Sequence, residues 1–180
     1  PVPLIITGRL RPPIYSGGNM TAIVFHQGKL MGDRKNALFT NPVTFVDAPK
    51  VFISEDKMFA FGISGKTISA ETKPRYEEII RKIIENMTIS GADRKAVDQI
   101  VEIEKGPIDF THGIICTKTQ QFLIQDIGKV YVRRFDGATH GCGTGGAQMA
   151  VMLRCGLSPT QAYNKITMID HLSGAKFDSI

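Results

Sequence analysis

Residues 73–89, KPRYEEIIRKIIENMTI, form an amphipathic segment around which the rest of the chain has to be arranged. Charged residues occupy one side of it, and apolar residues recur every three or four positions on the other, at Tyr76, Ile79, Ile80, Ile83, Ile84 and Met87. This spacing predicts a helix with a single buried face. Such a face needs an apolar surface to cover, and the segments on either side are typical of strands.

Two hairpins are predicted before this helix. The runs TAIVF and KLMGD flank a turn at residues 26–28 and alternate as strands do. Lys50–Ser54 and Lys57–Ile63 flank the turn Glu55-Asp56 and predict the second hairpin.

Two further segments have weaker patterns. Residues 36–49 contain Pro42 and Pro49, and proline cannot donate a hydrogen bond within a central sheet, so we expect short strands or an edge excursion there. After the main helix, Ala92–Glu102 is predicted as a second short helix, because its apolar residues fall on one face, at Val97, Ile100 and Val101.

A three-stranded meander is predicted next, from the runs THGIICTK, QFLIQDI and KVYVRRF, with turns at Thr119-Gln120 and Gly128. Two helices follow. The first ends at Gly156, and the second begins with Ser158 as N-cap and Pro159 in its first turn. We expect the buried face of the first helix to hold Ala147, Ala150, Val151 and Leu153.

The order of these elements predicts an α+β fold in which sheets pack on each other with helices outside. The 180 residues are 42% hydrophobic, which is enough for one domain with its own core, and we place that domain at residues 20–180. Residues 1–19 differ from it, because they are rich in proline and contain Gly17-Gly18. They are a leader added by cloning, which we favour, a natural propeptide, or a docking arm.

The charge pattern excludes few partners. The net charge is +5, but Lys and Arg are spread along the chain without interleaved aromatics, so nucleic-acid binding has little support. The charge equally fits general solubility or acidic partners. No apolar run is long enough to span a membrane.

Cysteine and histidine spacing predicts neither a disulfide framework nor a metal site. The odd set Cys116, Cys142 and Cys155 lacks a CxxC pair, and the four histidines are scattered; a reducing, cytoplasmic location is the simplest expectation. The run GTGG suggests a phosphate loop, but no Gly-Lys-Ser/Thr follows, so we expect no nucleotide and no other cofactor.

Several short sequence motifs, and their order along the chain, resemble those of a known family. They are MTAIV, the pair Gly32-Asp33, the pair Lys50-Val51, DKMFAFGISG, GCGTGGAQMA and SPTQAYNKITMID before HLSG. From Thr21 to Ile180 the chain resembles proteasome-type N-terminal-nucleophile (Ntn) hydrolases, and is similar to proteasome β subunits and to the bacterial ATP-dependent peptidase ring subunit. The resemblance implies a four-layer αββα sandwich.

The resemblance also implies a threonine peptidase. Thr21 would be the nucleophile, and its own amine would accept the hydroxyl proton once Met20 is removed. Asp33 and Lys50 match the acid and lysine that pair beneath that nucleophile. Without the resemblance, the favoured interpretation of Thr21 is a β-branched residue that opens a strand, and that of Asp33 and Lys50 is solvated surface charges.

Further positions match the family's supporting groups. Gly62, Ser64 and Gly65 lie where backbone N–H groups point at the substrate oxygen, although GISGK also fits an ordinary turn. Asp170 and Ser173 match the late acid and serine around the nucleophile, although a helix C-cap explains the same letters. Cys142 departs from the family, because many relatives carry a serine there.

Partners follow from the same resemblance. It implies a peptide or unfolded-protein substrate, a homo-oligomeric ring and an ATP-dependent unfoldase. The alternative is a catalytically silent, proteasome-like subunit with an assembly role. Such a subunit is expected to lack one of Thr21, Asp33 and Lys50, and all three are present.

Overall fold

The computed structural model describes residues 21–38, 44–65, 67–89, 99–102, 110–135, 137–169 and 176–180. The predicted leader at residues 1–19 lies outside them. The described strands are β1 (Ile23–His26), β2 (Lys29–Asp33), β3 (Lys35–Leu38), β4 (Thr44–Asp47), β5 (Val51–Ile53), β6 (Phe59–Gly65), β7 (Gln99–Val101), β8 (Phe110–Thr117), β9 (Gln121–Asp126), β10 (Val130–Phe135), β11 (His140–Cys142) and β12 (Phe177–Ser179). The described helices are α1 (Lys73–Ile89), α2 (Gly143–Arg154) and α3 (Pro159–Ile169).

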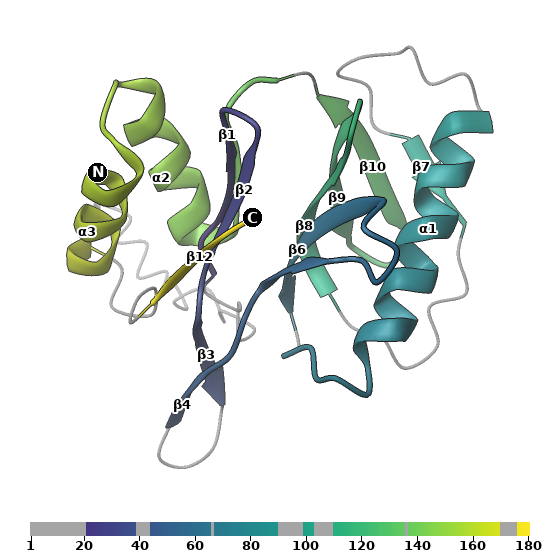
Figure 1. Cartoon of the computed structure of the whole chain (residues 1–180), viewed down its shortest axis with the longest axis horizontal. Coiled ribbons are helices and arrows are strands. Elements are labelled where there is room, and N and C mark those ends of the chain that lie inside the picture. Colours follow the sequence, from purple (N-terminus) through teal and green to yellow (C-terminus); the bar gives the residue numbers. More distant parts are fainter. Residues whose placement is uncertain are drawn as a thin grey trace, which may run out of the picture.

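The strands form two larger sheets and one small ribbon. The four-stranded sheet has the order β11-β1-β2-β12, and the six-stranded sheet has the order β5-β6-β8-β9-β10-β7. Strands β3 and β4 pair only with each other in the described residues, and this ribbon projects below the two sheets (Figure 1). All described pairings are antiparallel.

The predicted hairpins and meander are confirmed. Strands β1 and β2 are joined by Gln27 and Gly28, whose φ angles of 49° and 78° are those of a type I′ turn. Strands β5 and β6 pair as expected, and β8, β9 and β10 form the meander. The segment with the prolines contains β3 and β4, as predicted.

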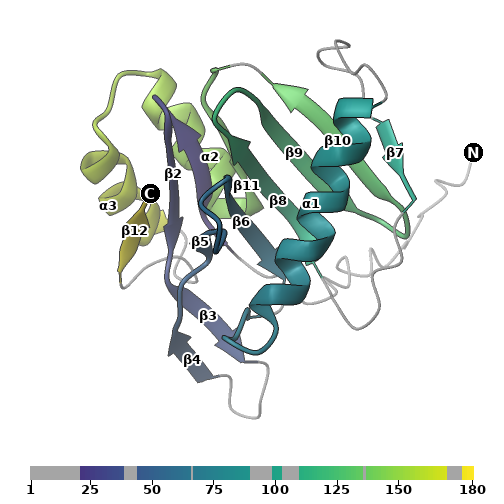
Figure 2. The same ribbon diagram turned by 45° about the vertical axis from the view of Figure 1, so that its right-hand side comes forward.

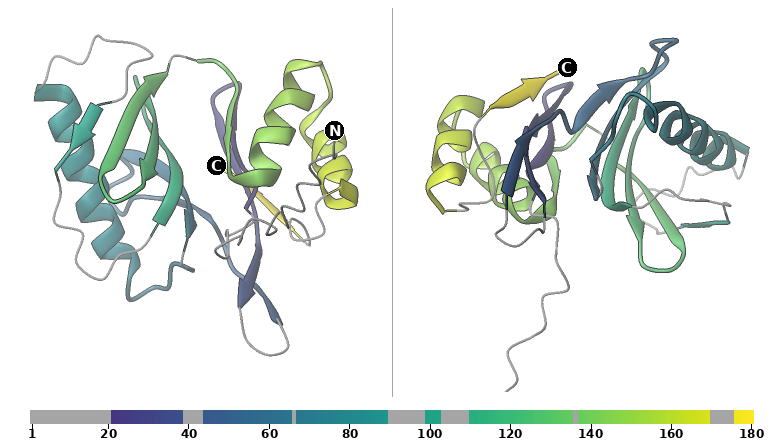
Figure 3. Two further views of the ribbon diagram at one scale, coloured as in Figure 1. Left: turned by 180° about the vertical axis from the view of Figure 1, so that it is seen from behind. Right: turned by 90° about the horizontal axis from the view of Figure 1, so that it is seen from below.

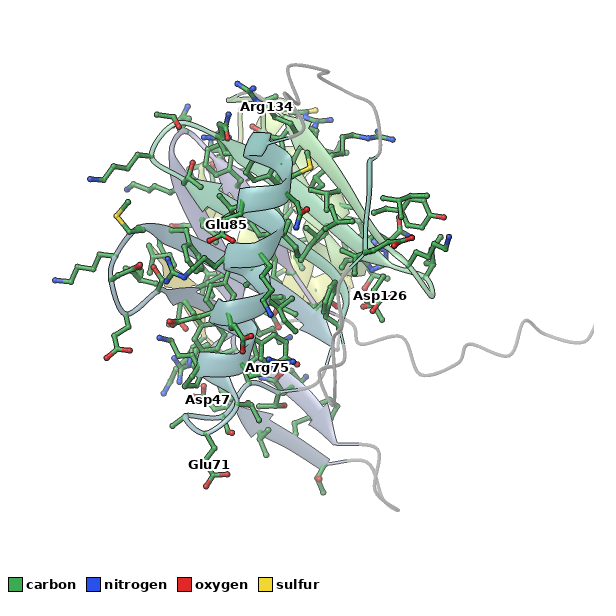
Figure 4. All side chains as sticks on the ribbon, turned by 90° about the vertical axis from the view of Figure 1, so that its right-hand side faces the viewer. Asp47, Glu71, Arg75, Glu85, Asp126 and Arg134 are labelled. Atoms are coloured by element: carbon green, nitrogen blue, oxygen red, sulfur yellow. The ribbon has the colours of Figure 1, made fainter. Side chains whose placement is uncertain are left out.

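Helix α1 covers the outer face of the six-stranded sheet (Figure 2). Its predicted apolar face packs against strands β6, β8, β9 and β10, with Ile83 fully buried. Its outward face carries charged side chains such as Arg75 and Glu85 (Figure 4). The helix is therefore held by tertiary packing of the stripe that its sequence predicts.

The two larger sheets pack face to face. Between them lies a cluster of buried apolar side chains, distinct from the one beneath α1. It joins Ile23, Phe25 and Leu30 of the four-stranded sheet to Val51 and Ile114 of the six-stranded sheet. A third cluster lies between the four-stranded sheet and helices α2 and α3, which flank it on the side away from α1 (Figure 3). No helix in these described ranges has the length and apolar character needed to cross a membrane.

Helices α2 and α3 form where predicted, but the buried face of α2 differs. Ala147 and Val151 are exposed, and the buried residues are Gly145, Gly146, Met149, Ala150 and Leu153. Glycines have no side chain to mark a buried face, so a hydrophobic pattern misses them. Gly156, with φ 90°, follows the C-cap Cys155, and the Ser158 hydroxyl accepts a hydrogen bond from the Gln161 N–H, as expected of the two helix ends.

The short helix predicted at Ala92–Glu102 is wrong at its described end. Gln99–Val101 is strand β7, which pairs with β10. Ile100 is exposed and Val101 is buried, because successive side chains of a strand point to opposite faces. Residues 92–98 lie outside the described residues.

The expected four-layer αββα sandwich of the Ntn type is wrong. The described residues are mostly antiparallel β-sheet: 42% of them lie in strands and 30% in three helices. The segment after α1 that was predicted to be a second short helix ends instead in strand β7. Among the described residues, α1 alone covers that face.

Candidate active site

A buried ion pair marks the predicted site. Lys50 Nζ lies 3.0 Å from Oδ1 and 3.1 Å from Oδ2 of Asp33. Asp33 is fully buried, and only 5% of the surface of Lys50 is exposed. Neither residue is a solvated surface charge, so each depends on its partner to offset the cost of leaving water.

Thr21 lies beside this pair. The N–H of Ala22, the next residue, donates a hydrogen bond of 2.9 Å to Oδ1 of Asp33, the oxygen that also faces Lys50. The N–H of Asp33 donates in turn to the Ala22 carbonyl at 3.0 Å. These bonds fix the main chain after Thr21, just before β1, so the structure brings the backbone of Thr21 next to the pair of Asp33 and Lys50.

The three residues meet because the two sheets approach closely at their ends. Asp33 ends β2 of one sheet, and Lys50 immediately precedes β5 of the other. At the neighbouring Gly32, a Cβ atom would lie 2.8 Å from Cγ1 of Val51. A side chain there would hold the sheets apart, so Gly32 permits the approach that lets Lys50 reach Asp33.

The predicted oxyanion residues lie along β6, and their environments differ. At Gly62 a Cβ would lie 2.6 Å from Cγ2 of Ile23, so its missing side chain serves the contact between sheets. The side chain of Ser64 is buried, and Thr111 Oγ1 donates to the Ser64 carbonyl at 3.2 Å.

Gly65 lies at an irregularity in the sheet. The register between β6 and β8 shifts at Ser64/Gly65, and the φ angle of Gly65 is 153°, which L-residues rarely adopt. The Ile63 N–H donates to the Lys50 carbonyl at 3.2 Å. Ile63, two residues before Gly65, therefore lies beside Lys50 where β6 pairs with β5.

Two residues that sequence reasoning missed also lie near this site. Burial, together with the negative charge of Asp33, raises the pKa of Tyr163 on α3 to about 12. The Tyr163 hydroxyl donates to the Lys176 carbonyl at 3.0 Å, which connects α3 to the segment before β12. Gly143, the first residue of α2, touches Thr21. Neither residue carries a sequence signal, because one is a surface-helix tyrosine and the other a glycine in a glycine-rich run.

Cys142 lies next to this contact. It pairs with Ile23 across β11 and β1, and it precedes α2 without a side-chain capping bond. Burial raises the pKa of its thiol to about 12, so the thiol stays protonated at neutral pH. Asp170 and Ser173, the predicted late acid and serine, lie outside the described residues.

The described residues offer no cluster of three or more His, Cys, Asp and Glu side chains that could hold a metal ion. What the site does contain is a hydroxyl, a carboxylate and an ammonium. The chain matches no protein-family model, and no curated protein matches it at a significant level. The case for function therefore depends on the geometry of these residues.

Proposed function

We propose that the chain is a threonine-type peptidase subunit whose nucleophile is Thr21, in a form where Thr21 carries a free amine. One observation carries the proposal. Thr21, Asp33 and Lys50 come from three separate segments and are all buried, and the main chain directly after Thr21 is bonded to the carboxylate that holds Lys50. A buried ammonium and carboxylate beside a hydroxyl are costly to maintain for structure alone, whereas they serve a reaction that develops negative charge.

Each group has a chemical task. The Thr21 hydroxyl oxygen bonds to the substrate carbonyl carbon, and its proton passes to the Thr21 amine. The amine returns this proton to the leaving nitrogen as the peptide bond breaks, which leaves an ester on Thr21. Water then hydrolyses the ester and releases the acid. Lys50 stabilises negative charge on the hydroxyl oxygen, and Asp33 holds Lys50 in position.

Gly65 is the best supported of the predicted oxyanion residues. It lies two residues along β6 from Ile63, whose N–H donates to the Lys50 carbonyl, and an N–H donor at this position would stabilise charge that appears on the substrate oxygen in the transition state. Ser64 and Gly62 support this position from the same strand, the first through its bonds to Thr111 and the second by letting the sheets meet.

The remaining parts of the proposal concern partners and compartment. A peptide or unfolded chain is the substrate class that fits a hydroxyl nucleophile beside an oxyanion donor. The expected assembly is a homo-oligomeric ring that receives its substrate from an ATP-dependent unfoldase. Exposed apolar side chains such as Phe45 and Met168 are available for contacts between subunits. Three free cysteines support a cytoplasmic location.

A silent assembly subunit is the second candidate, and one observation favours it. Only 2% of the surface of Thr21 is exposed, and Met20 precedes it, so its nitrogen is an amide in this chain. Without a free amine the hydroxyl lacks its base. In this form the fold serves assembly and no peptide is cleaved.

One experiment separates the two functions. Fluorogenic peptides are offered to the full chain, to a form with Thr21 as its first residue, and to Thr21→Ala and Thr21→Ser variants of that form. Peptidase activity is expected from the Thr21-first form and its Thr21→Ser variant, which keeps a hydroxyl, and from neither of the others. Equal cleavage by Thr21→Ala would remove Thr21 from the mechanism, and no cleavage by any form favours the silent subunit.

A further inference from the structure

The first residue of α2 is in direct contact with the main chain of Thr21. A Cβ atom at Gly143 would lie 2.0 Å from the Thr21 carbonyl oxygen, 2.8 Å from its carbonyl carbon and 3.2 Å from its Cβ. Non-bonded atoms do not approach to 2.0 Å, so only glycine fits here. Its φ angle of 75° also favours glycine.

Thr21 cannot give way to a side chain at Gly143 by changing a rotamer, because the obstacle is its carbonyl group. That carbonyl is followed by the Ala22 N–H, which is bonded to Asp33, and then by the β1 ladder, in which Ile23 pairs with Cys142. Any movement of the Thr21 main chain therefore acts on the bond to Asp33.

Two other glycines near the start of α2 also pack directly against backbone atoms, so neither position has room for a side chain. At Gly146 a Cβ would lie 2.5 Å from the Ile23 carbonyl oxygen, and at Gly141 a Cβ would lie 2.0 Å from the Gly146 carbonyl oxygen. The first turn of α2 is thus seated on the backbone of β1. Met149 and Leu153 bury the next turns in the cluster with α3.

We infer that Gly143 is a positioning residue of the site: by lacking a side chain it lets α2 seat against Thr21 and so fixes where the Thr21 hydroxyl lies relative to Lys50. This role deepens the proposed peptidase function, and its kinetic consequence rests on that function. Its structural consequence, the placement of Thr21 by Gly143, does not.

The test compares Gly143→Ala with Gly28→Ala. Gly28 has nearly the same φ angle, 78°, but no atom lies within 4 Å of its Cβ position. Both substitutions place alanine in the left-handed region, and only Gly143→Ala adds a methyl group against Thr21. The difference between the two variants isolates that contact.

Two measurements follow. In two-dimensional NMR of the full chain, Gly143→Ala is expected to shift the amide signals of Ala22 and Asp33, and Gly28→Ala to leave both in place. In the Thr21-first form, Gly143→Ala is expected to lower kcat by about a hundredfold with KM unchanged, as a misplaced nucleophile does, and Gly28→Ala to match the wild type. Unmoved Ala22 and Asp33 signals, or an unchanged kcat in an active enzyme, would overturn the inference.

The peptidase function and the positioning role of Gly143 can each be refuted without the other. If no form cleaves peptides, the peptidase function fails, and the NMR comparison alone decides the role of Gly143. If Gly143→Ala does not fold, the wild-type chain still provides a test, because a nuclear Overhauser contact between the Gly143 Hα atoms and the Thr21 Hβ is expected. Absence of that contact from a fully assigned spectrum would refute the placement.

Discussion

Asp33 ends a strand of one sheet and Lys50 directly precedes a strand of the other, and their charged groups lie 3.0 Å apart in the interior. The pair therefore connects the ends of two neighbouring strands from the two sheets. Its two roles, in holding the sheets and in the proposed chemistry, can be separated by measurement.

Lys50→Met is expected to lower the free energy of unfolding by about 3–5 kcal/mol, because the carboxylate of Asp33 stays buried without the ammonium that faces it. Urea unfolding measures the change. The control is Lys82→Met, which breaks an exposed pair with Glu78 and is expected to change stability by about 0.5 kcal/mol or less. Adding Asp33→Asn to Lys50→Met is expected to recover part of the loss. Equal effects of Lys50→Met and Lys82→Met would contradict a structural role for the pair.

Gly62→Ala is expected to destabilise the protein by about 1–3 kcal/mol, because the new methyl group overlaps Ile23 between the sheets. A double-mutant cycle with Ile23→Ala provides the control, since removing the Ile23 side chain makes room for the methyl group. The double variant is expected to be more stable than the sum of the two single changes predicts. Simple additivity would show that the two residues do not meet.

Stability is expected to rise with pH across the range in which two histidines titrate. Burial lowers the pKa of His112 below 6.5, and burial followed by the charges of Arg154 and Arg133 lowers that of His140. Between the lowered folded pKa and the unfolded pKa of 6.5, the unfolded chain binds protons that the folded chain does not. The free energy of unfolding therefore increases from acid pH and levels off above 6.5.

Urea unfolding at a series of pH values checks this expectation. His112→Gln and His140→Gln are each expected to remove part of the increase in the free energy of unfolding with pH. The double variant is expected to remove most of it. A double variant with the full pH dependence would assign the effect to other groups.

Only one of the three cysteines is expected to react quickly with a thiol reagent in the folded protein. Cys155 is exposed, whereas burial raises the pKa of both Cys116 and Cys142 to about 12 and leaves them protonated. Titration with a chromogenic disulfide at mildly alkaline pH counts the fast thiols. Cys155→Ser is expected to abolish the fast phase, and denaturant to release the other two. Fast reaction of Cys142 in the native state would show that the site end of β1 opens.

Sequence periodicity predicted the local elements well, because they depend on contacts close in the chain. Helix α1 has the predicted bounds, since its apolar stripe admits no other period. The first hairpin was predictable from a turn whose Gly28 needs a positive φ. The short segment at β7 was wrongly predicted as helix, because its pairing with β10 is a distant contact that overrides a weak helical pattern.

The candidate site was predictable in part. The resemblance identified Thr21, Asp33 and Lys50, and the structure places them together, although no pattern in the sequence gives the distance between Lys50 and Asp33. Gly143 and Tyr163 were missed, because their roles depend on how α2 and α3 seat against the four-stranded sheet. The four-layer αββα sandwich of the Ntn type, which the resemblance implied, was wrong, because the described residues are mostly antiparallel β-sheet with three helices.

The four-stranded sheet draws its strands from distant parts of the chain, with β1 and β2 near one end of the described residues and β11 and β12 near the other. A ribosome therefore releases β1 and β2 long before their outer neighbours exist, whereas most of the six-stranded sheet can assemble from consecutive segments. Thr21 gains its contact with the start of α2 only after residue 143 has been synthesised. A nascent chain thus carries Thr21 in an unfinished site, and the peptidase activity proposed for it would be absent until α2 has been made.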